Sequence, residues 1–198
     1  MPFLAKAWIE PYIGRVLQEV LNALSYLYGQ GYAHGDIKSG NILLGQNSHV
    51  FLADFGYSAS NFERRPSSSA NIGCAYWVPP KKAKTAMSDI WSFGITALEL
   101  AHGRPPVYCL PKSKTLVKRL STRLKLCPDM KKNFSENFGV MVEKCLQKDP
   151  AQRTTAENLL KCEFLTNNIL ESPDVIANIE GLSAIEGEEE EEDSELVW

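Results

Sequence analysis

The sequence lacks any C-x-x-C pair among its five cysteines. An odd number of cysteines at wide spacing argues against a disulfide framework and against a structural zinc site. We therefore expect reduced cysteines in an intracellular protein. The five are Cys74, Cys109, Cys127, Cys145 and Cys162.

The sequence also lacks a long hydrophobic run. Its most apolar segment, residues 89–101, contains Asp89 and Glu99 and is too short to span a bilayer. The first twelve residues show no cationic region followed by an apolar core, so we expect no signal peptide. These absences favour a cytoplasmic protein without a transmembrane segment.

Basic residues are missing from the end of the chain. Residues 171–198 carry eleven acids and no base, which leaves 13 acidic residues against 21 basic ones in the rest. Such an asymmetry indicates a basic surface that binds an anionic partner, or an acidic tail that screens it, or simply solvated charge. We expect residues 167–198 to be a disordered tail, and we expect no nucleic-acid partner.

Hydrophobic periodicity predicts the secondary structure. Apolar residues at spacings of three and four favour a helix from Pro11 to Gly29. Two short apolar runs, 41–45 and 50–56, favour a β-hairpin, and residues 57–84 have no period. A helix that is apolar nearly all round, with Ser88 as its N-cap and Gly103 at its end, should be the buried central helix.

Further helices are expected after this central helix. Thr154 or Thr155 is expected to cap the last of them, and Thr154 and Glu157 have the spacing of a capping box. In the helix before it, the side chains expected to point inward are Val140, Met141, Cys145 and Leu146. The predicted segments are 112–126, 134–147 and 156–165.

The polar stretch YAHGDIKSGNILL, residues 32–44, lies between the first helix and the hairpin. It is either a polar turn or a catalytic loop. The order His34-x-Asp36-x-x-x-x-Asn41, followed by the tripeptide DFG at 54–56, matches the catalytic-loop and metal-loop patterns of protein kinases. Each piece alone is weak, but their order on the expected elements strongly favours the kinase interpretation.

The chemistry of these residue types agrees with that interpretation. Asp36 would accept the proton of a substrate hydroxyl, and Lys38 would lie beside the transferred phosphoryl group. Asn41 and Asp54 offer the oxygen ligands that suit Mg²⁺. His34 is flanked by apolar residues, so we expect it to be structural rather than catalytic.

The resemblance extends over residues 1–166. The segments GDIKSGNILL, LADFGYSAS, SDIWSFGITALELAHGRPP and CLQKDPAQRTTAENLL resemble the Ste20-like serine/threonine kinases. They look closest to the oxidative-stress-responsive, Fray-like branch and to the plant kinase of blue-light stomatal signalling. The resemblance implies a mainly α fold, the kinase C-lobe, with a small β-hairpin that carries the catalytic and DFG loops.

The resemblance also implies roles for single residues. The cofactors would be ATP and Mg²⁺, with Asn41, Leu43 and Asp54 on the nucleotide side and Leu43 as the floor of the adenine pocket. Asp89 would anchor the catalytic loop from the central helix. His34 and Phe55 would stack in the regulatory spine.

The sequence departs from this family in its nucleotide-binding half. Residues 1–5 resemble the hinge between the kinase lobes, and the 198 residues contain no G-x-G-x-x-G and no strand lysine for the phosphates. We therefore expect the N-lobe to be absent from this chain and nucleotide binding to be weak.

The activation segment, expected at 54–81, departs from the family as well. Gly35 replaces the arginine that normally receives the activating phosphate, and Cys74 replaces a threonine near the catalytic loop. Lys81 stands where a glutamate would pair with Arg153, so the substrate platform should be deformed. Ser67, in RRPS, resembles a target for a basophilic kinase.

Two functional hypotheses follow. The chain is the C-lobe of a serine/threonine protein kinase that is inactive in isolation, or a non-catalytic remnant, a pseudokinase that binds proteins. A pseudogene product is a third possibility. In the first two cases the partners of the chain would be protein substrates or protein ligands. The face turned to a missing lobe would expose apolar side chains, so we expect self-association. Those side chains are Phe3, Leu4, Leu43 and Phe55.

Overall fold

A computed structural model describes residues 8–45, 49–55, 59–60, 76–79, 85–106 and 134–168. Within these ranges the protein is mainly helical, with two small antiparallel sheets. The helix predicted at 112–126 and residues 169–198 of the expected acidic tail lie outside the described residues, as do Phe3, Leu4, Ser67, Cys74 and Lys81. No helix in the described part is long and apolar enough to cross a membrane.

Helix α1 (Glu10–Gly29) confirms the first predicted helix. Pro11 lies in its first turn, where a missing N–H leaves no helical bond unmade. Its buried stripe repeats at spacings of three and four and faces the core. This stripe consists of Ile13, Val16, Leu17, Val20, Leu21 and Leu24.

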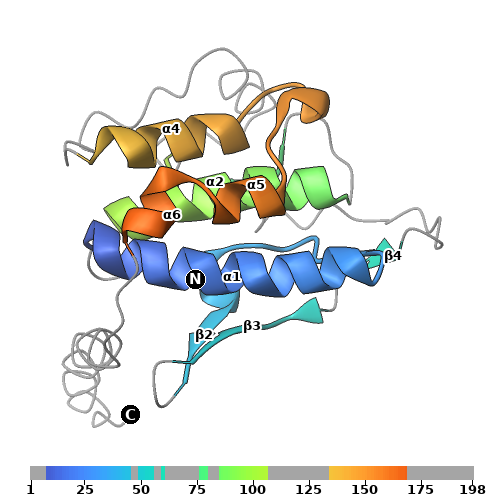
Figure 1. Ribbon diagram of the computed structural model, residues 1–198. Helices are drawn as coiled ribbons and strands as arrows, with labels where there is room; N and C mark the ends of the chain where they lie inside the picture. Colours follow the sequence, from blue (N-terminus) through green and yellow to red (C-terminus); the bar gives the residue numbers. More distant parts are fainter. Residues whose placement is uncertain are drawn as a thin grey trace, which may run out of the picture.

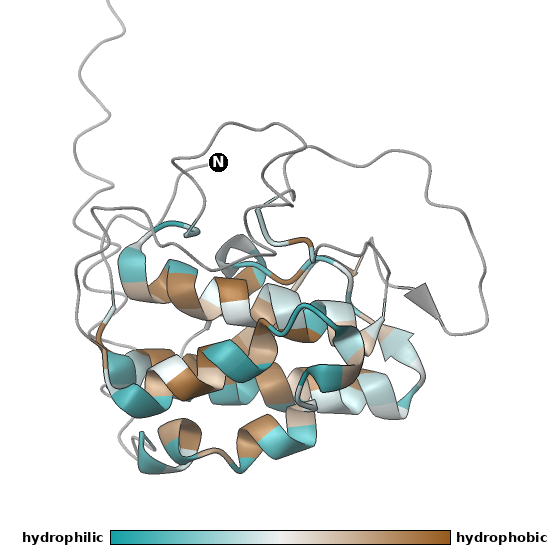
Figure 2. Ribbon diagram, turned by 90° about the horizontal axis from the view of Figure 1, so that it is seen from above, coloured by the Kyte–Doolittle hydropathy of each residue, from teal (hydrophilic) through white to brown (hydrophobic). Residues whose placement is uncertain are grey.

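Helix α2 (Ala86–His102) is the central helix and is buried on nearly every side. It contacts α1 and also α4 (Glu136–Cys145), and Figure 1 shows the helices in stacked layers. Gly103 ends α2 in the left-handed region, with φ 77°, as its sequence position predicted. Figure 2 shows brown apolar segments alternating with teal polar ones along the helices, the pattern of elements with one face in a core.

The prediction that Ser88 caps α2 was wrong. The N-cap is Thr85, whose side-chain oxygen accepts a hydrogen bond from the Ser88 N–H. The helix therefore begins three residues earlier than expected, and Ser88 is buried within its first turn. Thr85 and Ser88 both carry a hydroxyl and lie three residues apart, and hydrophobic periodicity alone does not distinguish which of them is the N-cap.

The end of the described chain also differs from the prediction. Instead of one helix over 156–165, two short helices form, α5 (Ala156–Leu160) and α6 (Glu163–Asn167). Of the two residues expected to cap this segment, Thr155 is the N-cap of α5 and accepts from the Asn158 N–H. The cap at Thr154 that a capping box with Glu157 required is therefore wrong.

The chain turns between α5 and α6 because Cys162 adopts an extended conformation. In α4, Val140 was expected to point inward but is exposed, whereas Met141, Cys145 and Leu146 are buried as predicted.

Strands β2 (Ile42–Leu44) and β3 (Val50–Leu52) form the predicted hairpin, with Leu43 opposite Phe51. A second pairing, β1 (Tyr32–Ala33) with β4 (Ala59–Ser60), was not predicted. Two-residue strands carry almost no periodicity, so hydrophobic patterning cannot predict them. Figure 1 shows the β2–β3 hairpin beside α1, and α1 contacts β3.

Candidate active site

The site is built on the loop between β1 and β2, which ends in a short 3₁₀ helix (Ser39–Asn41). The loop is rich in polar groups, yet Asp36, Lys38 and Asn41 are all buried. Burial of charged groups is unfavourable unless they are paired. The loop should therefore contain internal ion pairs and hydrogen bonds.

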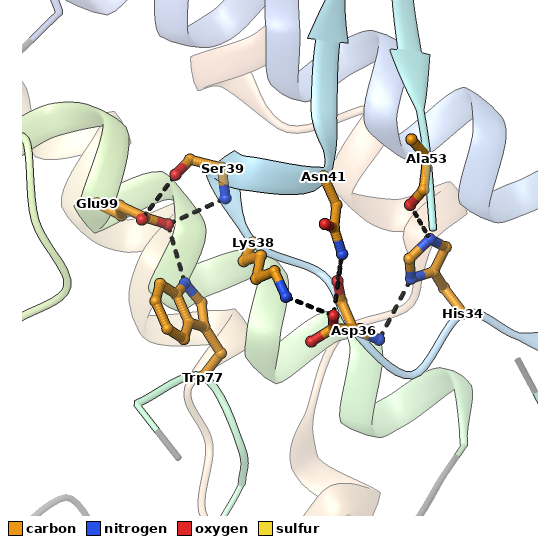
Figure 3. Close-up of polar contacts among 8 residues, drawn as sticks. All are labelled: His34, Asp36, Lys38, Ser39, Asn41, Ala53, Trp77 and Glu99. Carbon is orange, nitrogen blue, oxygen red and sulfur yellow. Dashed lines mark hydrogen bonds and ion pairs between the residues drawn. The ribbon is translucent and has the colours of Figure 1, made fainter. Parts of the chain in front are cut away.

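Figure 3 shows these pairings, which centre on Asp36. The Lys38 Nζ lies 2.5 Å from the Asp36 Oδ2 in an ion pair. The Asn41 Nδ2 donates to the same oxygen at 3.0 Å and to the Asp36 backbone oxygen at 2.7 Å. The structure therefore brings together three of the predicted site residues. Because the nitrogen of the Asn41 amide faces Asp36, its oxygen points away from that carboxylate.

His34 is fully buried and holds the start of this loop. Its Nε2 lies 3.0 Å from the Ala53 carbonyl oxygen, and its Nδ1 accepts from the Asp36 N–H at 3.2 Å. Burial lowers the pKa of His34, which keeps the ring neutral. A neutral ring with Nε2–H satisfies both bonds, which agrees with the structural role expected for this histidine.

Asp89 of α2 fixes the backbone of the same loop. Its carboxylate accepts from the N–H of His34 at 2.7 Å and of Gly35 at 2.8 Å, and from the Tyr28 hydroxyl at 3.4 Å. Burial raises the pKa of Asp89 to about 6, although the two backbone bonds and Tyr28 oppose the shift. The anchoring contact expected from the central helix is therefore present.

Gly35 is held between these bonds at a φ of 83°. Side chains with a Cβ rarely adopt this region of backbone conformation. The glycine that departs from the kinase pattern thus occupies a position where the backbone itself favours glycine.

Glu99 anchors the other end of the loop and was not predicted as a site residue. Its carboxylate accepts from the Ser39 N–H at 3.1 Å, the Ser39 hydroxyl at 2.6 Å and the Trp77 indole N–H at 2.9 Å. Burial raises the pKa of Glu99, and these bonds and the charge of Lys38 oppose the shift. The one available signal was an acidic residue inside an otherwise apolar helix.

Asp54 follows the hairpin at the same end at which Asn41 precedes it. Ile42 pairs with Leu52 there, and the Ala53 N–H donates to the backbone oxygen of Asn41 at 2.8 Å. Asp54 is exposed and has a φ of 64°, which is uncommon for a residue other than glycine. Such outliers are concentrated at functional sites.

Two of the apolar residues expected on the face turned to a missing lobe are exposed. Leu43 is 52% exposed on β2, and Phe55 is 50% exposed after Asp54. The Phe55 ring still meets the His34 ring edge-on, with centroids 5.1 Å apart. The stacking expected for the His34 and Phe55 rings is therefore observed, while about half of Leu43 is exposed.

The described residues fit a metal that is shared with a phosphate ligand. Among them, no group of three or more His, Cys, Asp or Glu side chains could hold a metal ion. Mg²⁺ in phosphate-transfer sites commonly takes one or two protein oxygens and completes its shell with phosphate and water. The Asn41 amide oxygen and the Asp54 carboxylate meet that requirement.

Arg153 was expected to lack its glutamate partner, and the structure shows which other groups bind its guanidinium. It donates to the backbone oxygens of Gln147, Met87 and Lys148, at 2.7, 2.8 and 3.3 Å. Its guanidinium also lies 5.1 Å from the centre of the Trp91 ring. Within the described ranges no carboxylate forms an ion pair with it, so backbone oxygens and an aromatic face stabilise it instead.

The buried Asp–Lys–Asn cluster and the aspartate after the hairpin follow the residue pattern of the catalytic and metal loops of protein kinases. Comparison with known proteins agrees with this class. The model of the protein kinase domain family matches residues 5–165. The chain belongs to the protein kinase domain family.

The relatives of this chain are serine/threonine kinases. It is 40% identical over 161 residues to serine/threonine-protein kinase fray2 of Dictyostelium discoideum, covering 78% of this chain and 16% of that one. It is 39% identical over 167 residues to serine/threonine-protein kinase ppk11 of Schizosaccharomyces pombe, covering 82% and 53%.

A human relative shows a similar level of identity. Mitogen-activated protein kinase kinase kinase kinase 3 is 38% identical over 170 residues, which cover 81% of this chain and 19% of that one. The chain thus spans between 16% and 53% of the length of these three relatives.

Proposed function

We propose that this chain carries the phosphoryl-transfer half of a serine/threonine protein kinase site. The observation that supports it best is the buried cluster in which Lys38 and Asn41 both bind the Asp36 carboxylate. Asp36 would orient a substrate hydroxyl and accept its proton. Lys38, 2.5 Å from that carboxylate, would move its ammonium toward the phosphoryl oxygens as negative charge develops there.

The roles of the other site residues follow from their positions. Asn41 and Asp54 would hold Mg²⁺, which neutralises phosphate charge when bound. Leu43 would contact the adenine from its exposed side. His34 and Asp89 would keep the loop in shape, since both bind its backbone rather than a substrate.

The proposal extends to domain organisation. Residues 1–166 would form the kinase C-lobe, with a hinge at 1–5 and an activation segment at 54–81, and residues 167–198 would form an acidic tail. The 198 residues contain no G-x-G-x-x-G. Rapid turnover of ATP would therefore need a glycine-rich lobe, supplied by further sequence or by another polypeptide, and the chain alone would bind ATP weakly.

The Ste20-like assignment is the finer part of the proposal. The lysine two residues after the catalytic aspartate favours serine and threonine over tyrosine as acceptors. The segments quoted above and the similarity to a kinase named fray2 support the Fray-like branch. The substrate would be a protein and the compartment the cytoplasm.

A phosphate-transfer assay tests the catalytic proposal. Labelled Mg-ATP and a general protein substrate are given to the chain alone and to the chain fused to the N-lobe of the relative fray2. We expect transfer only in the fusion, and we expect Asp36→Asn and Asp54→Ala to abolish it. Glu143→Ala, which removes an exposed carboxylate of α4, is the matched control and should retain activity.

Two outcomes would contradict the proposal. An inactive fusion that is folded would remove the catalytic assignment. Activity of the lone chain that Asp54→Ala abolishes would show that no added lobe is needed.

A second candidate function is a non-catalytic protein-binding module. The observation in its favour is an apolar face on the hairpin, where Leu43, Phe51 and Phe55 are each about half exposed. A fusion that folds and binds Mg-ATP without transferring phosphate would favour this function.

A further inference from the structure

One buried carboxylate connects the catalytic loop to a segment that is distant in sequence. Glu99 is 3% exposed and receives hydrogen bonds from Ser39 in the loop and from Trp77 in the segment 76–79. The two donors are 60 and 22 residues from Glu99. Figure 3 shows Glu99 between Ser39 and Trp77, with Lys38 next to Ser39.

Trp77 is attached to α2 at two points. Its indole N–H donates to Glu99 at 2.9 Å, and its backbone oxygen accepts from the Ser92 hydroxyl at 2.9 Å. The residue is itself buried. The segment 76–79 therefore cannot shift along α2 without breaking a bond to Glu99, to Ser92 or to both.

Ser39 also holds the loop on Glu99 through two hydrogen bonds. Its hydroxyl and its N–H bind the two oxygens of Glu99, so the carboxylate is held in one orientation. Ser39 is the first residue of the 3₁₀ helix, and Lys38 is its N-cap. The contact of Ser39 with Glu99 thus fixes the backbone position from which the Lys38 side chain extends to Asp36.

The donors on Glu99 depend on one another. A buried carboxylate that loses part of its hydrogen bonding is costly, and bonds within one buried network reinforce each other. Loss of the Ser39 hydroxyl would remove the bond to the Glu99 Oε1, while the Ser39 N–H and the Trp77 indole N–H still bind Oε2. The weakened network would then let the Trp77 bond open more often.

We propose that Glu99 is a positioning residue that couples the loop carrying Lys38 to Trp77, so that the catalytic loop and the segment 76–79 move as one body. The inference rests on the proposed function, because the coupling serves catalysis only if Lys38 serves phosphoryl transfer. It adds to that function a physical link between the transfer site and the activation segment.

Hydrogen exchange of the Trp77 indole proton tests the coupling without activity. In the full chain with labelled indole nitrogens, Ser39→Ala should accelerate that exchange about tenfold. The reason is that the loss of a hydrogen bond to a charged group changes an equilibrium constant by about tenfold or more. Ser39→Thr keeps the hydroxyl and should restore the slow exchange. A substitution of Glu99 itself is not needed, so the test does not depend on a variant that leaves a buried cavity.

Ser135→Ala is the matched control. It removes another serine–glutamate bond of 2.6 Å, from Ser135 to Glu10, at the start of α4. It should leave the Trp77 exchange unchanged. Equal or slower exchange in Ser39→Ala, or equal acceleration in Ser135→Ala, would overturn the coupling.

Kinetics in the active fusion give a second readout. Ser39→Ala and Trp77→Phe should each lower kcat more than they raise KM for ATP, and the double variant should be no slower than the worse single one, because both act through Glu99. Independent, multiplying effects would overturn the proposal. If the fusion transfers no phosphate, the proposed function fails, while the exchange experiment still decides the coupling.

Discussion

Gly35 combines a positive φ with a hydrogen bond from its own N–H to Asp89, next to the bond from the His34 N–H, so its conformation is not free to relax. We predict that Gly35→Ala destabilises the chain by about 1–2 kcal/mol, the cost of the left-handed region for a residue with a Cβ. Urea unfolding measures this. Gly40→Ala in the same loop is the control, because a Cβ there meets open space. Equal effects of the two substitutions would contradict the prediction.

Asp89 should make stability depend on pH in an unusual direction. Burial raises its folded-state pKa to about 6 from an ordinary value of 3.8, so the folded chain binds the proton more tightly than the unfolded chain. The contribution of Asp89 to the free energy of unfolding is then complete below about pH 4 and is lost as the pH rises through about 6. Asp89→Asn should remove this loss.

The measurement is the free energy of unfolding from pH 4 to 7 for both proteins. The difference between wild type and Asp89→Asn should shrink or change sign as the pH rises. Parallel curves of unfolding free energy against pH would contradict the prediction. They would show that the two backbone N–H bonds cancel the effect of burial on the pKa of Asp89.

At the scale of elements, the crossing of α2 and α4 depends on Gly94. A Cβ at this position would lie 2.7 Å from the Cβ of Cys145 and 3.1 Å from side-chain atoms of Leu146. We predict that Gly94→Ala destabilises the chain by about 1–3 kcal/mol, because the helices must separate. Thermal and urea unfolding would measure the loss.

Gly139→Ala is the matched control, since it lies in α4 with nothing within 4 Å of the added Cβ. It should stabilise by up to about 1 kcal/mol, through the better helix propensity of alanine. A neutral Gly94→Ala would show that the crossing has room to adjust.

The elements also show what sequence could predict. Helices α1 and α2 and the β2–β3 hairpin follow from periodicity, because each buries one face or nearly all of its surface. The break between α5 and α6 does not follow, since no glycine or proline marks Cys162. The β1–β4 pairing depends on segments 27 residues apart, and nothing in either segment encodes it.

The site divides in the same way. Asp36, Lys38, Asn41 and Asp54 could be predicted as site residues because their spacing is local. Glu99 was missed as a site residue because its partners lie far away in sequence, and a single glutamate carries no pattern.

For the whole molecule, the apolar face of the hairpin should control association. Leu43 and Phe51 are cross-strand partners and are 52% and 55% exposed. We predict that the chain self-associates, and that Leu43→Ser with Phe51→Ser weakens this at least about tenfold, since each buried side chain contributes about 1.5–3 kcal/mol. Sedimentation velocity over a range of concentrations is the measurement.

Tyr26→Ser is the control for this prediction. Tyr26 is 70% exposed on α1, outside the hairpin. Its loss should leave association unchanged. A monomeric wild-type chain at high concentration would contradict the prediction.

The two carboxylates of α2 have a consequence for synthesis. A nascent chain that has left the ribosome as far as Ser60 already contains Asp36, Lys38, Asn41 and Asp54. It contains neither Asp89 nor Glu99, whose bonds to the loop span 54 to 60 residues. The side chains proposed for catalysis are therefore made first, and the loop that carries most of them reaches its native shape only after α2 has emerged.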